Sequence, residues 1–324
     1  MAINNTTFRT FNSTNDFKGM VNVRKQCIET DKVDTISTLE HFLSLKEMAE
    51  TITQNHCEPP KDILIVELHG EIIGYCQIAW WVENDGTRLY LHVGYLIPQY
   101  RGNGIGTEML HWCEKRIREI AYKHPTKGRA MYGGNASSTE KDKIKLLTEN
   151  GYKPVFTQIE MEFNDFTLLK DYSLVNEFEI KPVKQSDLRI IWETINEVYT
   201  DRGTVAVQTE DDYREFISNT YNDSSLWQIA WKGSEIAALV LVEIKNGIGE
   251  ITEVSTKKKF RRQGLAQTLL TKCLENLKNR GVKIVRLHTS GENVSGAKTL
   301  YEKIGFKHLK DYIRYRKTLN GKLQ

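Results

Sequence analysis

The chain has 324 residues, of which 40% are hydrophobic and 27% charged, with a formal net charge of +3. At roughly 100–200 residues per domain, this length favours two domains, each able to bury its own core. The weak positive charge argues against a nucleic-acid partner, because nucleic-acid-binding domains are usually more basic and carry clustered charge. No apolar run approaches the roughly 18 residues of a membrane span, so no membrane partner is expected.

The N-terminus and the cysteines point to a cytoplasmic protein. The first residues show no basic segment followed by an apolar one, so no signal peptide is expected. The five cysteines are scattered and form no Cys-x-x-Cys pair, which argues against a disulfide framework and a structural zinc site. We expect free thiols in a reducing cytoplasm, and no bound metal.

An internal repeat organises the chain. Residues 98–110 and 258–270 share the pattern Arg-x-x-Gly-x-Gly/Ala followed by a helical pattern, so that Arg101 corresponds to Arg261. A turn glycine leads into a β-rich run upstream of each motif. A helix that ends at glycine precedes a strand downstream of each motif, at Gly151 and at Gly305. The chain therefore contains two copies of one domain in tandem.

The predicted elements follow the same order in both halves. A helical stretch (39–55; 187–199) precedes a β-meander (63–96; 226–256), and the glycine turn, a helix, a strand, a helix and a strand follow. In the second half these later elements are expected at 267–280, 283–289, 295–303 and 312–318. Such an order is typical of a layered, mixed α/β domain. Periodicity is lost in 164–176, which predicts domains of residues 1–168 and 169–324.

The glycine turn of the second copy, Arg261–Ala266, lies between a predicted strand (248–256) and a predicted helix (265–277). Small residues there let backbone N–H groups converge, and with the positive helix end they form an anion site suited to a pyrophosphate. Arg261 and Arg262 add positive charge, and the lysines at 257–259 could meet a further phosphate. A single such turn could also be a plain tight turn. A Rossmann dinucleotide site is disfavoured, because this turn comes late, after a meander.

The turn resembles the pyrophosphate loop Arg/Gln-x-x-Gly-x-Gly/Ala of the GCN5-related N-acetyltransferase (GNAT) superfamily, and both copies match it. Residues 293–306 are similar to the family's Asn…Ala-x-x-Leu-Tyr-x-x-x-Gly-Phe signature. The two-copy arrangement resembles mycothiol-synthase-like tandem members. The resemblance implies two GNAT-like domains, each a mixed, mostly antiparallel sheet flanked by helices. It also implies acetyl-CoA as co-substrate, direct attack by an amine, and no metal.

The resemblance also assigns the contacts to acetyl-CoA. In the second copy these are the loop, the strand before it and one asparagine: Val254, Thr256, Arg261, Arg262, Gln263, Gly264, Leu265, Ala266 and Asn293. In the first copy they are Arg101, Gly102, Gly104 and Gly106. Two alternatives stay open, because Val254 could be a plain core residue and Asn293 a helix N-cap.

Three residues of the second copy are candidates for the chemistry. The resemblance makes Tyr301 the general acid near the CoA sulfur, and a phenol with a pKa of about 10 is protonated at neutral pH; a core tyrosine is the alternative. An acceptor ammonium needs a base. Glu250 stands at the spacing of the carboxylate base in the tandem members, and Glu253 lies on the same strand. Either carboxylate could instead belong to a solvated face. His288 is a further candidate for substrate binding or proton relay.

The first copy has Leu147 where the second has Tyr301, counted back from the final glycine. A leucine cannot protonate a thiolate, so we expect the first domain to be degenerate and the second to be catalytic. The first domain could bind CoA without turnover or form a wall of the acceptor cleft. The leading function is acetyl transfer to a primary amine of a small molecule. A protein-amine acetyltransferase and a non-catalytic acyl-CoA sensor or scaffold are alternatives, and a homodimer is left open.

Overall fold

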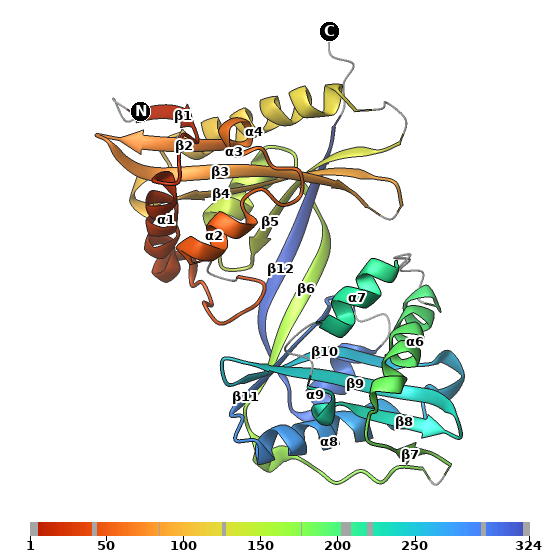
Figure 1. The fold of residues 1–324 in the computed structure, drawn as a ribbon. Coiled ribbons are helices and arrows are strands. Elements are labelled where there is room, and N and C mark those ends of the chain that lie inside the picture. The colour runs from red at the N-terminus through yellow and green to blue at the C-terminus, as the bar shows by residue number, and fades with distance from the viewer. Residues whose placement is uncertain are drawn as a thin grey trace. The chain divides into compact units, whose positions relative to one another are not determined.

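The computed structural model describes residues 6–319, apart from 41–43, 84, 125–127, 176, 202–208, 219–222 and 293–295. The chain forms two compact units (Figure 1). Unit 1 consists of Met1–Thr157 together with Tyr312–Gln324, and unit 2 consists of Gln158–Asp311.

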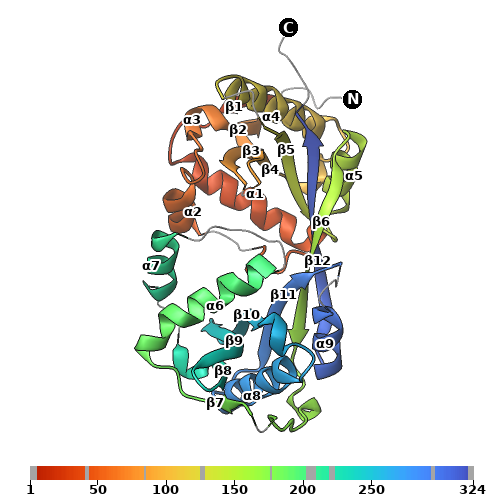
Figure 2. The same ribbon diagram turned by 90° about the vertical axis from the view of Figure 1, so that its right-hand side faces the viewer.

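The first repeat contains helices and strands in the order expected for an α/β domain. They are β1 (Thr6–Thr10), α1 (Asp16–Asp31), α2 (Leu45–Thr51), α3 (Pro59–Asp62), β2 (Ile63–Leu68), β3 (Glu71–Val82), β4 (Arg88–Leu96), α4 (Ile105–Tyr122), β5 (Ala130–Ser137), α5 (Lys141–Glu149) and β6 (Lys153–Phe163). Helix α4 lies on one side of the sheet and α1 on the other (Figure 2).

The second repeat follows the same order after a short strand. Its elements are β7 (Glu179–Ile180), α6 (Leu188–Asp201), α7 (Glu210–Ser218), β8 (Gln228–Lys232), β9 (Glu235–Lys245), β10 (Ile248–Thr256), α8 (Leu265–Asn279), β11 (Ile284–Ser290), α9 (Ala297–Ile304) and β12 (Lys307–Thr318). The strand order is β1-β2-β3-β4-β5-β12 in unit 1 and β6-β11-β10-β9-β8-β7 in unit 2. The described ladders are antiparallel except for β4–β5 and β10–β11.

The two repeats exchange their final strands. Strand β6 follows α5 of the first repeat, yet Gln158–Phe163 pairs antiparallel with β11 in unit 2. Strand β12 follows α9 of the second repeat, yet Tyr312–Thr318 pairs antiparallel with β5 in unit 1. The expected division into 1–168 and 169–324 follows the order of the repeats in the sequence. The compact units differ from it because each sheet is completed by a strand of the other repeat.

Burial on both faces of the central strands explains the layers. Every residue of β9 from Ile236 to Val242 is buried, and a strand of this kind needs cover on both sides. In unit 2, α6 lies on one face of the sheet and α8 on the other (Figures 1 and 2). Leu269, Cys273 and Leu277 belong to the fully buried stripe of α8, as its helical periodicity predicts.

Helix α1 is an element that the periodicity did not predict. Its buried face is not purely apolar, because the charged residues at both ends of the helix are also buried, in ion pairs. Asp16 pairs with Arg9 at 2.7 Å, and Asp31 pairs with Arg101 at 2.6 Å. Charged residues that are buried through such pairs do not register in a search for hydrophobic periodicity.

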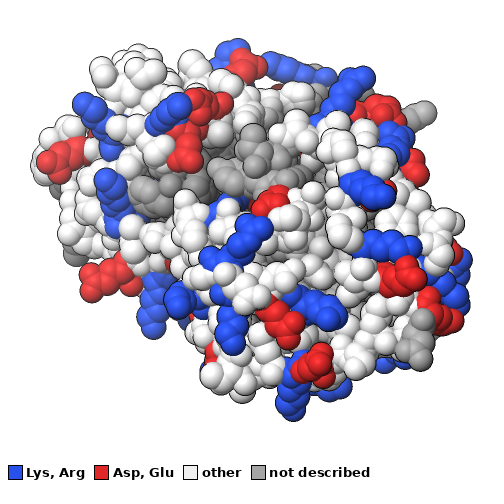
Figure 3. All heavy atoms as spheres, turned by 60° about the horizontal axis from the view of Figure 1, so that its bottom comes forward, with Lys and Arg blue, Asp and Glu red and all other residues white. Residues whose placement is uncertain are grey.

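No helix among the described residues is long and apolar enough to cross a membrane. On the face drawn in Figure 3, lysines and arginines are interspersed with aspartates and glutamates. This face therefore carries charges of both signs in the same area.

Candidate active site

A fork between two parallel strands lies at the centre of each unit. In unit 2, β10 and β11 pair over Ile248–Ile251 and Ile284–Leu287, and the described pairing stops there. The register of β10 against β9 shifts at the same place, between Ile251 and Glu253. In unit 1, β4 and β5 pair over Arg88–Leu91 and Ala130–Gly133 in the same way. Parallel strands that part in this manner leave room for an extended ligand between them.

The loop before α8 turns through the left-handed region of the backbone at two positions. Arg262 and Gly264 adopt positive φ values of 63° and 78°, and Gly264 is the N-cap of α8. Arg261 Nε donates to the Thr256 carbonyl at 3.1 Å. Among the described residues, the buried atoms Arg261 Nη2 and Gln267 Nε2 have no hydrogen-bond partner. Buried donors without partners at a positive helix end fit a phosphate group.

The predicted contact residues of this loop differ in how far they are buried. Leu265 is buried in the core, while Val254 is half-buried against it. Gln263 and Ala266 are half-buried, and Arg262 is exposed. Asn293 lies outside the described residues. The predicted phosphate role of the neighbouring lysines meets competition, because Lys257 and Lys259 both form ion pairs with Glu235.

Tyr301 lies in α9, which packs beside α8, and its side chain is buried with a relative exposure of 6%. Its ring meets the ring of Phe306 edge-on, with centroids 6.0 Å apart. The ring thus belongs to the core of unit 2, as the alternative of a packed tyrosine foresaw. A buried ring fixes the direction of its hydroxyl, which a general acid also requires.

The opposite face of the unit 2 sheet carries a row of charged side chains. A side chain at Gly249 would meet Leu277 of α8, so the neighbouring Glu250 faces away from α8. Across the strands, the residues directly opposite one another form the row Glu243, Glu250, Arg286 and Glu162. Arg286 Nη2 lies 3.0 Å from Glu162 Oε2, so the row is held together by charge.

His288 stands one residue beyond the last residue of β11 that pairs with β10, and therefore at the fork. Its Nδ1 lies 3.8 Å from Glu250 Oε1, and its Nε2 lies 3.4 Å from Oε1 of the buried Glu160. The carboxylate of Glu253, on the same strand as Glu250, accepts hydrogen bonds from the Tyr199 hydroxyl, at 2.9 Å, and from Ser255. The fork thus joins an imidazole to two carboxylates.

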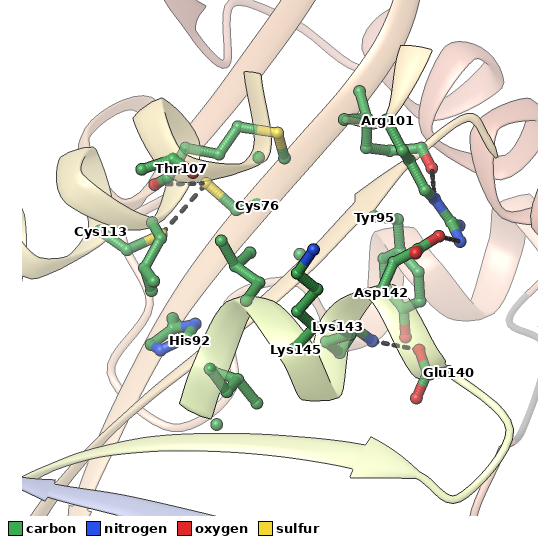
Figure 4. A pocket seen from close by; sticks show the side chains of 18 of the residues that line it. Cys76, His92, Tyr95, Arg101, Thr107, Cys113, Glu140, Asp142, Lys143 and Lys145 are labelled. Carbon is green, nitrogen blue, oxygen red and sulfur yellow. Dashed lines mark hydrogen bonds and ion pairs between the residues drawn. The ribbon is translucent and has the colours of Figure 1, made fainter. Parts of the chain in front are cut away.

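Unit 1 contains a cavity of about 360 Å³ at its own fork (Figure 4). It is lined by Gly102, Gly104 and Gly106 of the loop, by residues 94–96 of β4, and by Gly134 and Asn135 of β5. Gly102 and Gly104 have positive φ values of 76° and 87°, so this loop turns as its counterpart in unit 2 does. In Figure 4, Arg101 and Asp142 lie toward one end of the cavity, and His92 and Cys113 lie toward the other.

The apolar end of this cavity is built around His92 and Leu147. Burial lowers the pKa of His92 to about 4, so its imidazole is neutral above that pH. Its Nε2 lies 3.0 Å from the Tyr152 hydroxyl. Leu147 lines the cavity and packs against Gly134, where an added Cβ would lie 2.9 Å from the leucine side chain. No proton donor therefore stands at the position that Tyr301 occupies in the second repeat.

Comparison with known families now decides the identity of both repeats. The model of the acetyltransferase (GNAT) family matches residues 31–125 and 192–306, one match in each repeat. The chain belongs to the GNAT family. It is a tandem GNAT protein of the N-acetyltransferase type, and the family and fold class that the repeat predicted are confirmed.

Solved structures share this fold over the whole chain. A GCN5-related N-acetyltransferase from Sphaerobacter thermophilus is 20% identical with a TM-score of 0.77, over 100% of this chain and 98% of that one. A tandem GNAT protein from the clavulanic acid biosynthesis pathway is 11% identical with a TM-score of 0.66, over 98% and 99%. A glucosamine N-acetyltransferase region of a fungal multi-domain β-N-acetylglucosaminidase is 12% identical with a TM-score of 0.65, over 98% of this chain and 38% of that one. No curated protein matches the sequence.

Sequence reasoning missed Glu160 and Glu162 of this GNAT protein. The run Glu160-Met161-Glu162-Phe163 alternates charged and apolar residues, which is readable as a strand with one polar face. Nothing in that pattern shows that the polar face belongs to unit 2. Among the described residues, no group of His, Cys, Asp and Glu could hold a metal ion.

Proposed function

We propose that the chain transfers the acetyl group of acetyl-CoA to a primary amine of a small molecule, and that unit 2 carries the reaction. The observation that supports this best is the group of Glu250, His288 and Glu160 at the fork of a GNAT fold. A proton acceptor at the point where the strands part stands where acyl transfer to an amine would need it. The phosphate-ready loop at Arg261–Ala266 lies on the same β10–α8 connection.

In this proposal acetyl-CoA binds along the fork of unit 2. The backbone N–H groups of Arg261–Ala266 hold the pyrophosphate, with the help of Arg261 and Gln267, whose buried nitrogens have no partner among the described residues. Val254 and Thr256 lie on the strand that would run beside the pantetheine arm. Open space surrounds Gly264, since a Cβ there would meet nothing within 4 Å.

The reaction then needs three proton transfers. The acceptor ammonium, with a pKa of about 10.4 if it resembles lysine, gives a proton to the Glu250–His288 pair. The amine nitrogen attacks the thioester carbonyl, the C–N bond forms and the C–S bond breaks. The departing thiolate takes the proton of the Tyr301 hydroxyl, and the second proton that the nitrogen loses as it becomes an amide restores that hydroxyl. Glu253, held by Tyr199 and Ser255, would bind the cationic part of the acceptor.

The acidic character of the fork supports a cationic acceptor. Glu250, Glu253 and Glu160 place negative charge around the position that the ammonium would take. An amino sugar is one acceptor to test, because one of the similar structures is described as a glucosamine N-acetyltransferase region. Amino acids, polyamines and aminoglycosides are the others.

Unit 1 is proposed to bind CoA without turning it over. Its cavity of about 360 Å³ lies beneath a loop of the same shape. Leu147 replaces the acid, so this unit can hold a thioester but cannot protonate a thiolate.

The proposal is tested on the full chain with acetyl-CoA and a panel of these amines. Release of CoA is followed with a thiol reagent, and the acetylated product is identified by mass spectrometry. The assay suits this protein because all five of its cysteines are buried. We expect one class of amine to be acetylated far faster than acetyl-CoA is hydrolysed. Binding of CoA with no turnover of any small or protein amine would instead favour the sensor.

A further inference from the structure

We propose that Glu160, which the first repeat supplies on β6, orients the imidazole of His288 for proton transfer in unit 2. The second repeat would then lack a complete catalytic group without the last strand of the first repeat. This inference rests on the proposed function, which it extends by one positioning residue.

Glu160 and His288 face each other across an antiparallel strand pair. They are directly opposite in the register of β6 and β11, and such opposite side chains lie on the same face of the sheet. Glu160 has a relative exposure of only 1%. Burying a carboxylate costs free energy unless charged or hydrogen-bonding partners surround it. Its charged neighbours include His288 at 3.4 Å and Arg286 at 3.5 Å.

The neighbouring charges divide between these partners. Arg286 lies closer to Glu162, at 3.0 Å, than to Glu160. Glu162 is therefore the nearer carboxylate partner of Arg286, and Glu160 lies between the arginine and the imidazole. The other charged groups of this face are Glu250 on β10, which faces Nδ1 of His288, and Glu243 on β9, which pairs with Lys245 at 2.8 Å. Lys310 is a further buried cation of unit 2.

His288 lies between two carboxylates. Glu160 is the nearer one, at 3.4 Å from Nε2 against 3.8 Å between Glu250 and Nδ1, and the buried Nε2 has no hydrogen-bond partner among the described residues. In the proposal Glu160 therefore holds the imidazole proton on Nε2 and leaves Nδ1 to accept one. When the acceptor reacts, an N–H bond of its ammonium breaks and an N–H bond forms at Nδ1. The charge of Glu160 then stabilises the imidazolium, in the manner of the aspartate that orients a catalytic histidine.

The test replaces Glu160 by glutamine in the full chain. We expect kcat to fall about 10- to 100-fold, less than the 10²–10⁴ of a whole general base, with the KM for acetyl-CoA unchanged. The acidic limb of kcat/KM should move to lower pH, because loss of a nearby negative charge lowers the pKa of an imidazole. A merely structural role would not move this limb.

Two further variants control the result. Glu162→Gln removes a carboxylate from the same strand and the same face, but it also leaves Arg286 with Glu160 as its nearer carboxylate, so the acidic limb should move in the same direction and by less than in Glu160→Gln. In a His288→Gln background, Glu160→Gln should cause no further loss of kcat, because Glu160 acts only through the imidazole that this background lacks. A full, additive loss in that background would overturn the inference.

A second readout works without an identified acceptor. The tautomer of the His288 imidazole, followed by 15N NMR in the protein alone, should have its proton on Nε2 in the parent and lose this preference in Glu160→Gln. An unchanged tautomer in a folded Glu160→Gln protein would refute the positioning role. Should the glutamine variant fail to fold, Glu160→Asp keeps the charge and should keep the parent's tautomer, and a changed tautomer there would count against the proposal. If instead the parent acetylates no amine at all, the proposed function fails, and the NMR experiment still tests Glu160.

Discussion

The phosphate loops of the two units share a backbone but differ in charge. Both turn through positive φ at two positions, 102 and 104 in unit 1 and 262 and 264 in unit 2. In unit 1 the guanidinium of Arg101 is held by both oxygens of Asp31, at 2.6 and 2.8 Å. Burial alone would lower the pKa of Arg101, but the hydrogen bond to Asp31 and its charge raise it. Arg261 has a buried nitrogen with no partner among the described residues, so its charge is better placed to serve a ligand.

The two forks differ in a matching way. The row Glu250, Arg286 and Glu162 of unit 2 corresponds by register to Tyr90, Tyr132 and Lys317 in unit 1. The residue of unit 1 at the position of His288 is Gly134, which faces Tyr315 where His288 faces Glu160. The repeat therefore keeps its backbone in both units, while an imidazole between two carboxylates stands at these positions in unit 2 and is replaced by Gly134 and the tyrosines in unit 1. The difference teaches that one backbone can carry two different sets of polar side chains at the same positions of its sheet.

The largest expected effect is a contrast between two glycine variants. Gly264→Asp should abolish acetyl transfer, because a carboxylate enters the phosphate site, whereas Gly104→Asp should leave substantial turnover. Both positions have positive φ and open space around the Cβ, so the backbone cost of the two changes is matched. Turnover and calorimetric CoA binding measure the outcome. Activity lost in Gly104→Asp but kept in Gly264→Asp would show that unit 1 is the catalytic one.

The second effect concerns the acid. Tyr301→Phe removes only a hydroxyl, and we expect turnover to fall by roughly 10²–10⁴ while CoA binding changes little. The buried ring keeps its packing against Phe306 in the variant, so the unfolding temperature should stay close to that of the parent. Turnover within twofold of the parent would assign Tyr301 to the core alone.

The third effect is a pH dependence of stability that belongs to unit 1. Burial lowers the pKa of His92 from 6.5 to about 4, so below pH 6.5 the unfolded chain binds a proton that the native chain does not. The contribution of His92 to the free energy of unfolding should then decrease as the pH is lowered from about 6.5 to about 4, by up to about 3 kcal/mol. Below about pH 4 this contribution should stay constant. Urea unfolding of the parent and of His92→Phe at several pH values checks this. As the pH is lowered through that range, the free energy of unfolding of the parent should decrease relative to that of His92→Phe. A constant difference between the two free energies would contradict the prediction.

The smallest effect concerns a strained residue in the loop of unit 2. Arg262 adopts a φ of 63° where the first repeat has Gly102 with a φ of 76°. Arg262→Gly should relieve this strain, and after the entropy cost of glycine we expect a gain of about 0.5 kcal/mol in the free energy of unfolding. The reverse change, Gly102→Arg, should destabilise unit 1. Thermal unfolding of both variants tests the pair, and a loss of stability in Arg262→Gly would show that the arginine side chain stabilises the loop.

The sequence alone determined the family, the repeat and the position of the two glycine turns, because these depend on residues close together in the chain. A glycine that permits positive φ before an amphipathic helix is recognisable at fixed spacing, as at Gly104 and Gly264. Glu250 was predicted from its spacing in the tandem members that the chain resembles, and its role as the base stays a prediction. The order of the strands along the chain was predictable for the same reason.

Only the tertiary structure decided which strands complete each sheet and which charges meet. The backbone N–H and C=O groups of β6 could pair with the edge of any strand, so the sequence of β6 does not show that its partner is β11. The contacts of Glu160 with His288 and of Arg101 with Asp31 join residues far apart in the sequence. Such contacts follow from long-range register and burial, which leave no local pattern to read.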